Sequence, residues 1–135
     1  MPDLAQFEGE WHLHRVIADA RAGHEVVFEG RARFAPDEAG LVYHEDGHLH
    51  LPGQAPMAAT RRYLWRADGA GIAVLHADGR PFHVIAPGDR PAVAHDCAPD
   101  LYRGAYDFTG WPAWSSHWRV TGPRKDYTMR SDYVR

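Results

Sequence analysis

The sequence predicts an all-β fold, an antiparallel barrel of about eight to ten strands. Apolar residues recur at every second position in most segments, as Trp11, Leu13 and Ile17 do near the start of the chain. Because side chains alternate between the two faces of a strand, this spacing gives each strand one buried face. The 13 glycines and 10 prolines lie between such segments and leave no room for long helices. A β-sandwich is the alternative arrangement.

Each expected strand lies between two turn signals. The segments that alternate are residues 9–17, 28–34, 41–45, 48–51, 59–66, 72–76, 82–85, 91–97, 102–108, 114–120 and 127–134. Asp-Gly pairs at 46–47 and 78–79 are hairpin signals, and further bends are expected at 36–37, 68–69, 87–88 and 122–123. Only residues 2–8 and 18–25 have room for a helical turn.

Length and charge restrict the class of protein. A chain of 135 residues predicts a single domain over residues 1–135, and a formal net charge of −3 provides no basic field for nucleic acid. No stretch approaches the ~18 apolar residues of a membrane span, and the first residues lack the features of a secretion signal. The single cysteine, Cys97, cannot form an internal disulfide. We therefore expect a cytoplasmic protein with no nucleic-acid or membrane partner.

Charged residues share the inward parity of the predicted barrel. Arg15 lies on the same face as the apolar residues of the first strand, Glu45 on the face of Tyr43, and Arg61 on the face of Tyr63. Buried charges are costly unless they are paired or hydrated, so a dry core would not collect them. A barrel with a partly polar cavity accommodates them. The alternative is an internal salt bridge between Arg15 and Glu45 that only sets strand register.

Other candidate site residues lie on the later strands. His83 follows the turn at 78–79 and is expected near the barrel mouth, where an imidazole can bind an anion or move a proton; a solvated hairpin is the alternative. His95 and Tyr102 are candidate hydrogen-bonding groups of the cavity. Trp118 can supply an aromatic wall or ordinary packing. Cys97 shares a face with His95, but nothing supports a nucleophile there, so a small buried thiol is expected.

No metal site or resident cofactor is expected. Two pairs, His12 with His14 and His48 with His50, each place two imidazoles on one strand face. A cupin-type metal site would need a glutamate shortly after the histidine pair, and neither pair is followed by one. The first pair also has outward parity. A haem held by one axial histidine is left open, because no feature selects which of the ten histidines would bind it.

Several segments resemble, in order, a family of uncharacterised bacterial lipocalin-like proteins of the calycin superfamily. Gly9-x-Trp11 is similar to the lipocalin opening motif, and the wider resemblance covers FEGEWHLHRVIAD, LVYHEDGHL, RRYLWR, DGRPFH, HDCAPDLY and GPRKDYTMRSDY. It implies a calycin-type barrel and transfers no catalytic residue. It also implies that a basic side chain near the end of the chain, Arg124, Lys125 or Arg130, packs over Trp11.

The combined expectation is a small-molecule binding protein that holds an aromatic or anionic ligand inside the barrel. A cofactor-free lyase or isomerase that uses His83 or His95 as its acid or base is the alternative, and a barrel with no ligand is a third hypothesis. A homodimer is left open. The expected ligand-binding residues are Arg15, Glu45, Arg61, Tyr63, His83, His95, Tyr102 and Trp118.

Overall fold

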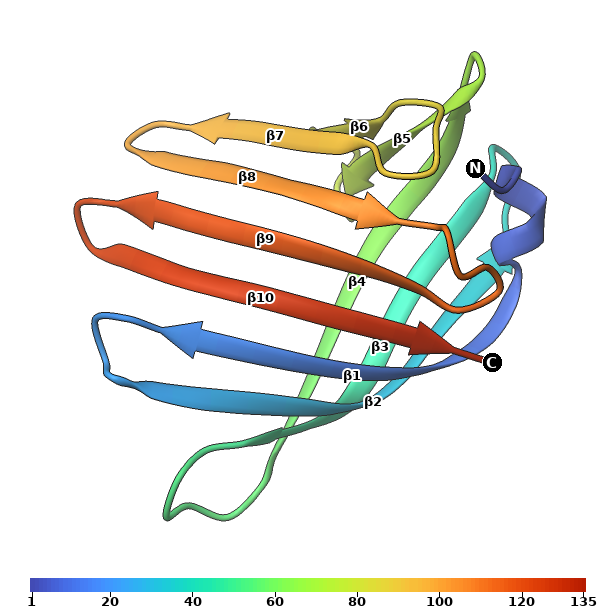
Figure 1. Cartoon of the computed structure of the whole chain (residues 1–135). Coiled ribbons are helices and arrows are strands. Elements are labelled where there is room, and N and C mark those ends of the chain that lie inside the picture. Colours follow the sequence, from blue (N-terminus) through green and yellow to red (C-terminus); the bar gives the residue numbers. More distant parts are fainter.

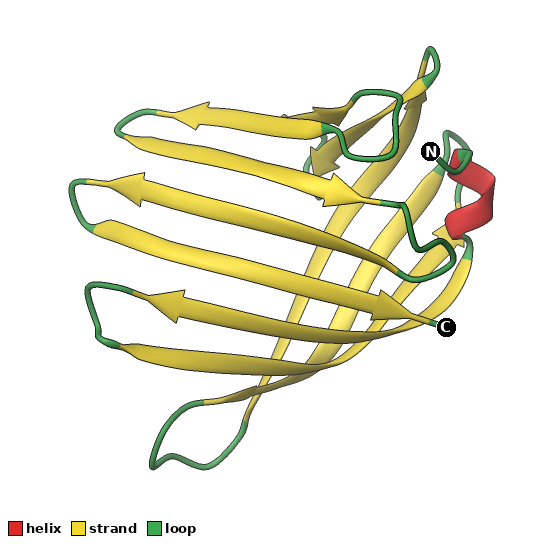
Figure 2. Cartoon of the chain, viewed as in Figure 1, coloured by secondary structure: helices red, strands yellow, loops and turns green.

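The computed structural model describes residues 1–135, in which a short 3₁₀ helix, η1 (Leu4–Phe7), precedes ten strands (Figures 1 and 2). The strands are β1 (Gly9–Asp19), β2 (His24–Pro36), β3 (Leu41–His50), β4 (Met57–Asp68), β5 (Gly71–His76), β6 (Pro81–Ile85), β7 (Ala92–Cys97), β8 (Asp100–Asp107), β9 (Trp114–Gly122) and β10 (Lys125–Val134). All paired strands are antiparallel. The predicted all-β barrel is confirmed. None of the helical segments has the length and apolar character of a membrane-spanning helix.

The barrel is nearly closed. The strands follow the order β6-β5-β4-β3-β2-β1-β10-β9-β8-β7, so β6 and β7 are the two edges of one sheet that curls around on itself. No ladder of backbone hydrogen bonds joins these two edges. We call the line between β6 and β7 the seam. Side chains, rather than backbone pairing, therefore close the wall at this place.

Strand β1 shows the alternation that the sequence predicts. Trp11, Leu13 and Arg15 are buried, whereas His12 and His14 between them are exposed. The strand pairs with β2 on one side and with β10 on the other. Because side chains repeat at every second residue, the apolar positions force Arg15 into the interior.

The helix η1 covers one end of the barrel (Figure 1). Phe7 is completely buried, and its ring packs against the rings of Phe34, Trp65, Phe108, Trp111 and Trp114. The indole Nε1 of Trp11 donates a hydrogen bond to the carbonyl oxygen of Phe7 at 2.9 Å. This end of the barrel is therefore closed by packed aromatic rings.

A basic side chain does cover Trp11, but it is Arg135, whose guanidinium lies 4.0 Å from the ring centre. The expectation of Arg124, Lys125 or Arg130 is wrong. Strand β10 runs toward the closed end, which leaves residues 124 and 125 at the opposite end of the barrel. Arg130 points outward and pairs with Asp132 at 3.1 Å.

The Asp-Gly signal at 46–47 does not mark a turn. Strand β3 runs through it, and Gly47 faces Gly30 of β2. A Cβ added to Gly47 would clash with the backbone of Glu29, so this glycine permits the close approach of two strands. The turn between β3 and β4 lies instead at residues 51–56, whereas the Asp-Gly signal at 78–79 does close the β5–β6 hairpin.

Replacing Trp11 by alanine should lower the free energy of unfolding by about 3–5 kcal/mol, because it removes a large side chain from a packed interior. Replacing Arg135 by alanine should cost about 1 kcal/mol, the scale of a cation–π contact at a surface. Denaturation by guanidinium chloride measures both values. A loss below about 1 kcal/mol for Trp11→Ala would contradict the packing described for the closed end.

Candidate functional site

A cavity of about 490 Å³ lies inside the barrel, between its aromatic closed end and the end away from η1. We call that end, formed by the turns at 20–23, 51–56, 77–80, 98–99 and 123–124, the mouth. Exposed Arg80 and Cys97 line the outer part of the cavity, and buried Trp65 and Trp114 line its inner part. All eight residues predicted from the sequence line this one cavity: Arg15, Glu45, Arg61, Tyr63, His83, His95, Tyr102 and Trp118.

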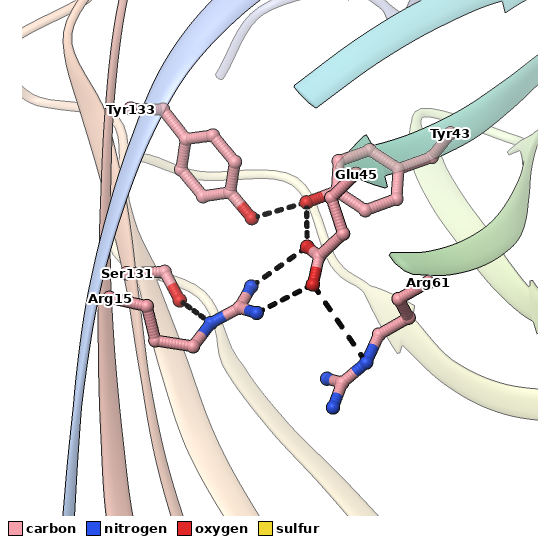
Figure 3. Close-up of polar contacts among 6 residues, drawn as sticks. All are labelled: Arg15, Tyr43, Glu45, Arg61, Ser131 and Tyr133. Carbon is pink, nitrogen blue, oxygen red and sulfur yellow. Dashed lines mark hydrogen bonds and ion pairs between the residues drawn. The ribbon is translucent and has the colours of Figure 1, made fainter. Parts of the chain in front are cut away.

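An ion pair between Arg15 and Glu45 forms one side of the cavity (Figure 3). Two guanidinium nitrogens of Arg15 donate to the two carboxylate oxygens of Glu45 at 2.6 and 2.9 Å. The Nε–H of Arg15 donates to the hydroxyl of Ser131 at 2.7 Å. Arg15 and Glu45 are only 7% and 2% exposed. This two-pronged geometry compensates much of the cost of burying both charges.

Two buried phenols extend this network (Figure 3). Tyr43 donates its hydroxyl proton to Glu45 at 2.5 Å, so the hydroxyl of Tyr133 donates in turn to Tyr43 at 2.8 Å. Burial raises the pKa of Tyr43 well above its usual value and that of Tyr133 to about 12. Burial alone would raise the pKa of Glu45, but hydrogen bonding and the charge of Arg15 bring it below its ordinary value. Glu45 is therefore an ionised carboxylate at neutral pH, and it accepts three hydrogen bonds.

Arg61 reaches the same carboxylate from the mouth (Figure 3). Its Nε lies 3.8 Å from an oxygen of Glu45, and its side chain is 45% exposed. The guanidinium also stands 6.0 Å from the ring centre of Tyr63. Because 3.8 Å is too long for a hydrogen bond, the N–H donors of Arg61 are available to a molecule that enters the mouth.

Aromatic rings line the wall opposite this network. His95 and Tyr102 stand directly across from one another on β7 and β8, with ring centres 5.6 Å apart. Phe82 lies against both of them and against Trp118, at 5.1, 6.1 and 5.6 Å respectively. Strict alternation does not predict Phe82 on this wall, because Phe82 adjoins His83 and only one of two successive residues should face inward.

His83 lies deeper than predicted. It was expected near the mouth, but it is only 7% exposed and packs against Trp118. Its Nε2 lies 2.9 Å from the hydroxyl of Tyr106, while its Nδ1 has no hydrogen-bond partner. Burial lowers the pKa of His83 to about 3, and the nearby imidazoles of His95 and His76 add to this effect. The ring is therefore neutral at pH 7.

Cys97 is exposed, which corrects the expectation of a buried thiol. It is the last residue of β7 and lies beside the turn at 98–99, where the barrel wall ends. The histidine pairs also point outward, because His12, His14, His48 and His50 are all exposed. No group of three or more His, Cys, Asp or Glu side chains is arranged to hold a metal ion.

Comparison with known proteins places the chain in a family. The model of a family of unknown function, DUF6314, matches residues 7–135. The chain belongs to this family. No curated protein matches this DUF6314 member.

The solved structures that share the fold of this DUF6314 chain include the following two. One is the S-type phycobiliprotein lyase CPES from Guillardia theta, at 8% sequence identity and a TM-score of 0.63, covering 98% of this chain and 89% of that one. The other is a DUF3598 protein of unknown function from Nostoc punctiforme, at 10% identity and a TM-score of 0.59, covering 98% of this chain and 48% of that one. At such identities the likeness concerns the fold alone.

Replacing Glu45 by glutamine should lower the free energy of unfolding by about 3–5 kcal/mol, because Arg15 is left buried without a counter-charge. Glu29→Gln on the outer face is the matched control and should cost at most about 1 kcal/mol. The double variant Arg15→Met, Glu45→Leu should regain most of the stability. Equal losses for Glu45→Gln and Glu29→Gln, measured by chemical denaturation, would contradict the buried pair.

The stability should fall in acid partly through His83. Its pKa of about 3 in the folded chain lies below the ordinary value of 6.5, so the unfolded chain binds the proton first as the pH drops. Stability is then complete above pH 6.5 and is lost progressively toward pH 3. Between pH 7 and 4.5 the wild type should lose about 2–3 kcal/mol more than His83→Gln does. The free energy of unfolding is measured by chemical denaturation at both pH values. An equal loss of stability in the wild type and in His83→Gln would contradict the buried neutral imidazole. His12→Gln is the control and should lose as much stability as the wild type.

Proposed function

We propose that the chain is a lipocalin-like, calycin-type barrel that binds a small organic anion with a flat aromatic body. One observation carries this proposal: the charge of the cavity wall. Three arginines, Arg15, Arg61 and Arg80, and a single carboxylate, Glu45, line the cavity. Arg80 is paired with Asp78, so the wall keeps one positive charge in excess when its histidines are neutral. The volume of the cavity, about 490 Å³, lies in the range of small-molecule sites.

Arg61 is the residue proposed to bind the anionic group. Arg15 is held by Glu45 and Ser131, and Arg80 forms a 2.7 Å ion pair with Asp78. Arg61 makes a 3.8 Å ion contact with Glu45 and lies 6.0 Å from the ring centre of Tyr63, and neither contact is a hydrogen bond. A guanidinium binds a carboxylate or phosphate group through two parallel hydrogen bonds, and its place at the mouth lets an incoming anion reach it.

The aromatic body of the ligand is proposed to lie along Tyr63, Tyr102 and Trp118. These rings come from β4, β8 and β9 and so surround the cavity from several sides. His95 adds a polar edge beside Tyr102. Flat rings gain offset-stacked and edge-to-face contacts with such walls. Arginine at the mouth and aromatic rings farther in thus favour a molecule with an acidic group at one end.

Catalysis is the second candidate function, and the name of the Guillardia theta protein, a lyase, adds support from fold analogy alone. A general acid or base works best when its pKa lies near the working pH. The pKa of about 3 for His83 makes that residue a poor choice. His95, half-buried beside Tyr102, is the better candidate for an acid or base in a lyase or isomerase reaction.

Calorimetric titration with aromatic carboxylates tests the binding function. 2-Naphthoate should bind, and its neutral analogue 2-naphthamide should bind at least about tenfold more weakly, which corresponds to about 1.4 kcal/mol. Arg61→Gln should weaken 2-naphthoate binding about tenfold and leave the amide unaffected. Arg62→Gln is the matched control, because Arg62 is the next residue on β4, does not line the cavity and should bind as wild type. A wild type that binds no member of a panel of aromatic carboxylates would overturn the proposal.

A further inference from the structure

The ring of Phe82 stands in the middle of a group of nearly parallel rings. Trp118 lies 5.6 Å away at an interplanar angle of 13°, His76 lies 4.8 Å away at 21°, and Tyr63 lies 5.5 Å away at 25°. Trp118 belongs to β9, beyond the seam, whereas the other two belong to β4 and β5 on the same side as Phe82. The phenyl ring thus fills a slot whose walls come from both halves of the sheet.

Phe82 is held in this slot less firmly than the core residues are held. It is only half-buried, while His83 beside it is almost completely buried. It belongs to the short edge strand β6, next to the seam, where no backbone ladder joins the two sides. The preceding Pro81 has no N–H to donate, and the β5–β6 register shifts at Val74/Leu75. A rotation of the Phe82 side chain therefore breaks contacts between rings, but it breaks no backbone ladder between β6 and β7.

A buried polar atom lies beside the slot. The Nδ1 of His83 has no partner, and the His83 ring is edge-on to that of Phe82, with centres 4.5 Å apart. The contact between Nε2 and the hydroxyl of Tyr106 fixes the plane of the imidazole. Buried polar groups in folded proteins are nearly always hydrogen-bonded, so an orphaned nitrogen on a cavity wall points to a missing partner.

We propose that Phe82 occupies the place of the ligand's own flat ring, and that it swings out when that ring stacks on Trp118 and a polar ring substituent hydrogen-bonds to Nδ1 of His83. This inference rests on the proposed binding function and narrows its ligand class. The ligand is a planar aromatic acid that carries a hydroxyl group away from its acidic group. A hydroxyl satisfies either tautomer of His83, because it can both donate and accept.

Removing the Phe82 side chain gives the first test. Phe82→Ala should bind 2-naphthoate about tenfold more tightly than the wild type, because no ring has to be displaced, whereas Trp118→Ala should bind it more weakly. If Phe82 were instead a fixed wall of the site, its loss would weaken binding. If the wild type binds 2-naphthoate and Phe82→Ala binds it more weakly, this inference is overturned, whereas the proposed binding function is not.

A measurement on the wild type avoids dependence on how well that variant folds. With ¹³C-labelled phenylalanine rings, the Phe82 resonances should show a ring-current shift from Trp118 in the free protein. They should move toward random-coil values when 2-naphthoate saturates the site. Phe82 resonances that keep their shift in the saturated complex would overturn the displacement.

The role of His83 is tested by two amide replacements. Asparagine places its amide near the position of Nδ1, and glutamine reaches the position of Nε2. The affinities of a set of hydroxylated 2-naphthoates are compared with that of 2-naphthoate. The wild type and His83→Asn should bind the best hydroxylated compound about tenfold more tightly than 2-naphthoate. His83→Gln should bind the two compounds with similar affinity. The same preference in both variants, or none in the wild type, would overturn the role given to Nδ1. Absence of binding for all carboxylates would instead overturn the underlying binding function.

Discussion

Arg15 and Glu45 meet inside the barrel from strands that are not neighbours, because β2 lies between β1 and β3. The guanidinium passes over Phe28 of β2, 5.5 Å from its ring centre, before it reaches the carboxylate. Ser131 joins the pair from β10. One buried interaction therefore depends on the register of four adjacent strands. A slip of one residue in β1 or β3 would turn one charge outward and leave its partner buried alone, which is strongly unfavourable. A slip in β10 would remove the hydroxyl of Ser131 from Arg15.

The same pair determines the electrostatics of the cavity. Glu45 is the only carboxylate on the wall, and Arg15 and Tyr43 use its oxygens. The positive charge of Arg61 is consequently balanced only in part. The interaction that orders the strands thus also leaves an unsaturated guanidinium at the mouth, where the exposed side chain is partly hydrated and can exchange water for an anion at modest cost. The structural role therefore belongs to Arg15, and the proposed binding role belongs to Arg61.

Parity along regular strands predicted much of this site. Arg15, Glu45 and Tyr63 follow apolar neighbours on uninterrupted strands, and counting by two places them correctly on the cavity wall. Parity alone could not place Phe82, because the register shift between β5 and β6 brings two successive residues to the cavity. Parity also could not show that Gly47 lies within a strand rather than in a turn. The reason for a glycine there is the close approach of the neighbouring strand β2, which the sequence of β3 does not show. Arg135 was missed because strand direction relative to the closed end is a property of the assembled barrel.

The seam connects this architecture to the proposed binding role. Edge strands expose unpaired backbone groups, and β6 and β7 limit that exposure by being five and six residues long. Across the seam, rings take the place of a ladder, with Phe82 of β6 against His95 of β7 at 5.1 Å. Local openings of a protein concentrate where few backbone bonds and few buried contacts must break, so the wall is weakest beside the cavity. A flat ligand that contacts Trp118 on one side and Tyr63 on the other would bridge both halves of the sheet. Binding and closure of the barrel would then stabilise each other, because a ligand that favours the closed wall shifts the population toward it.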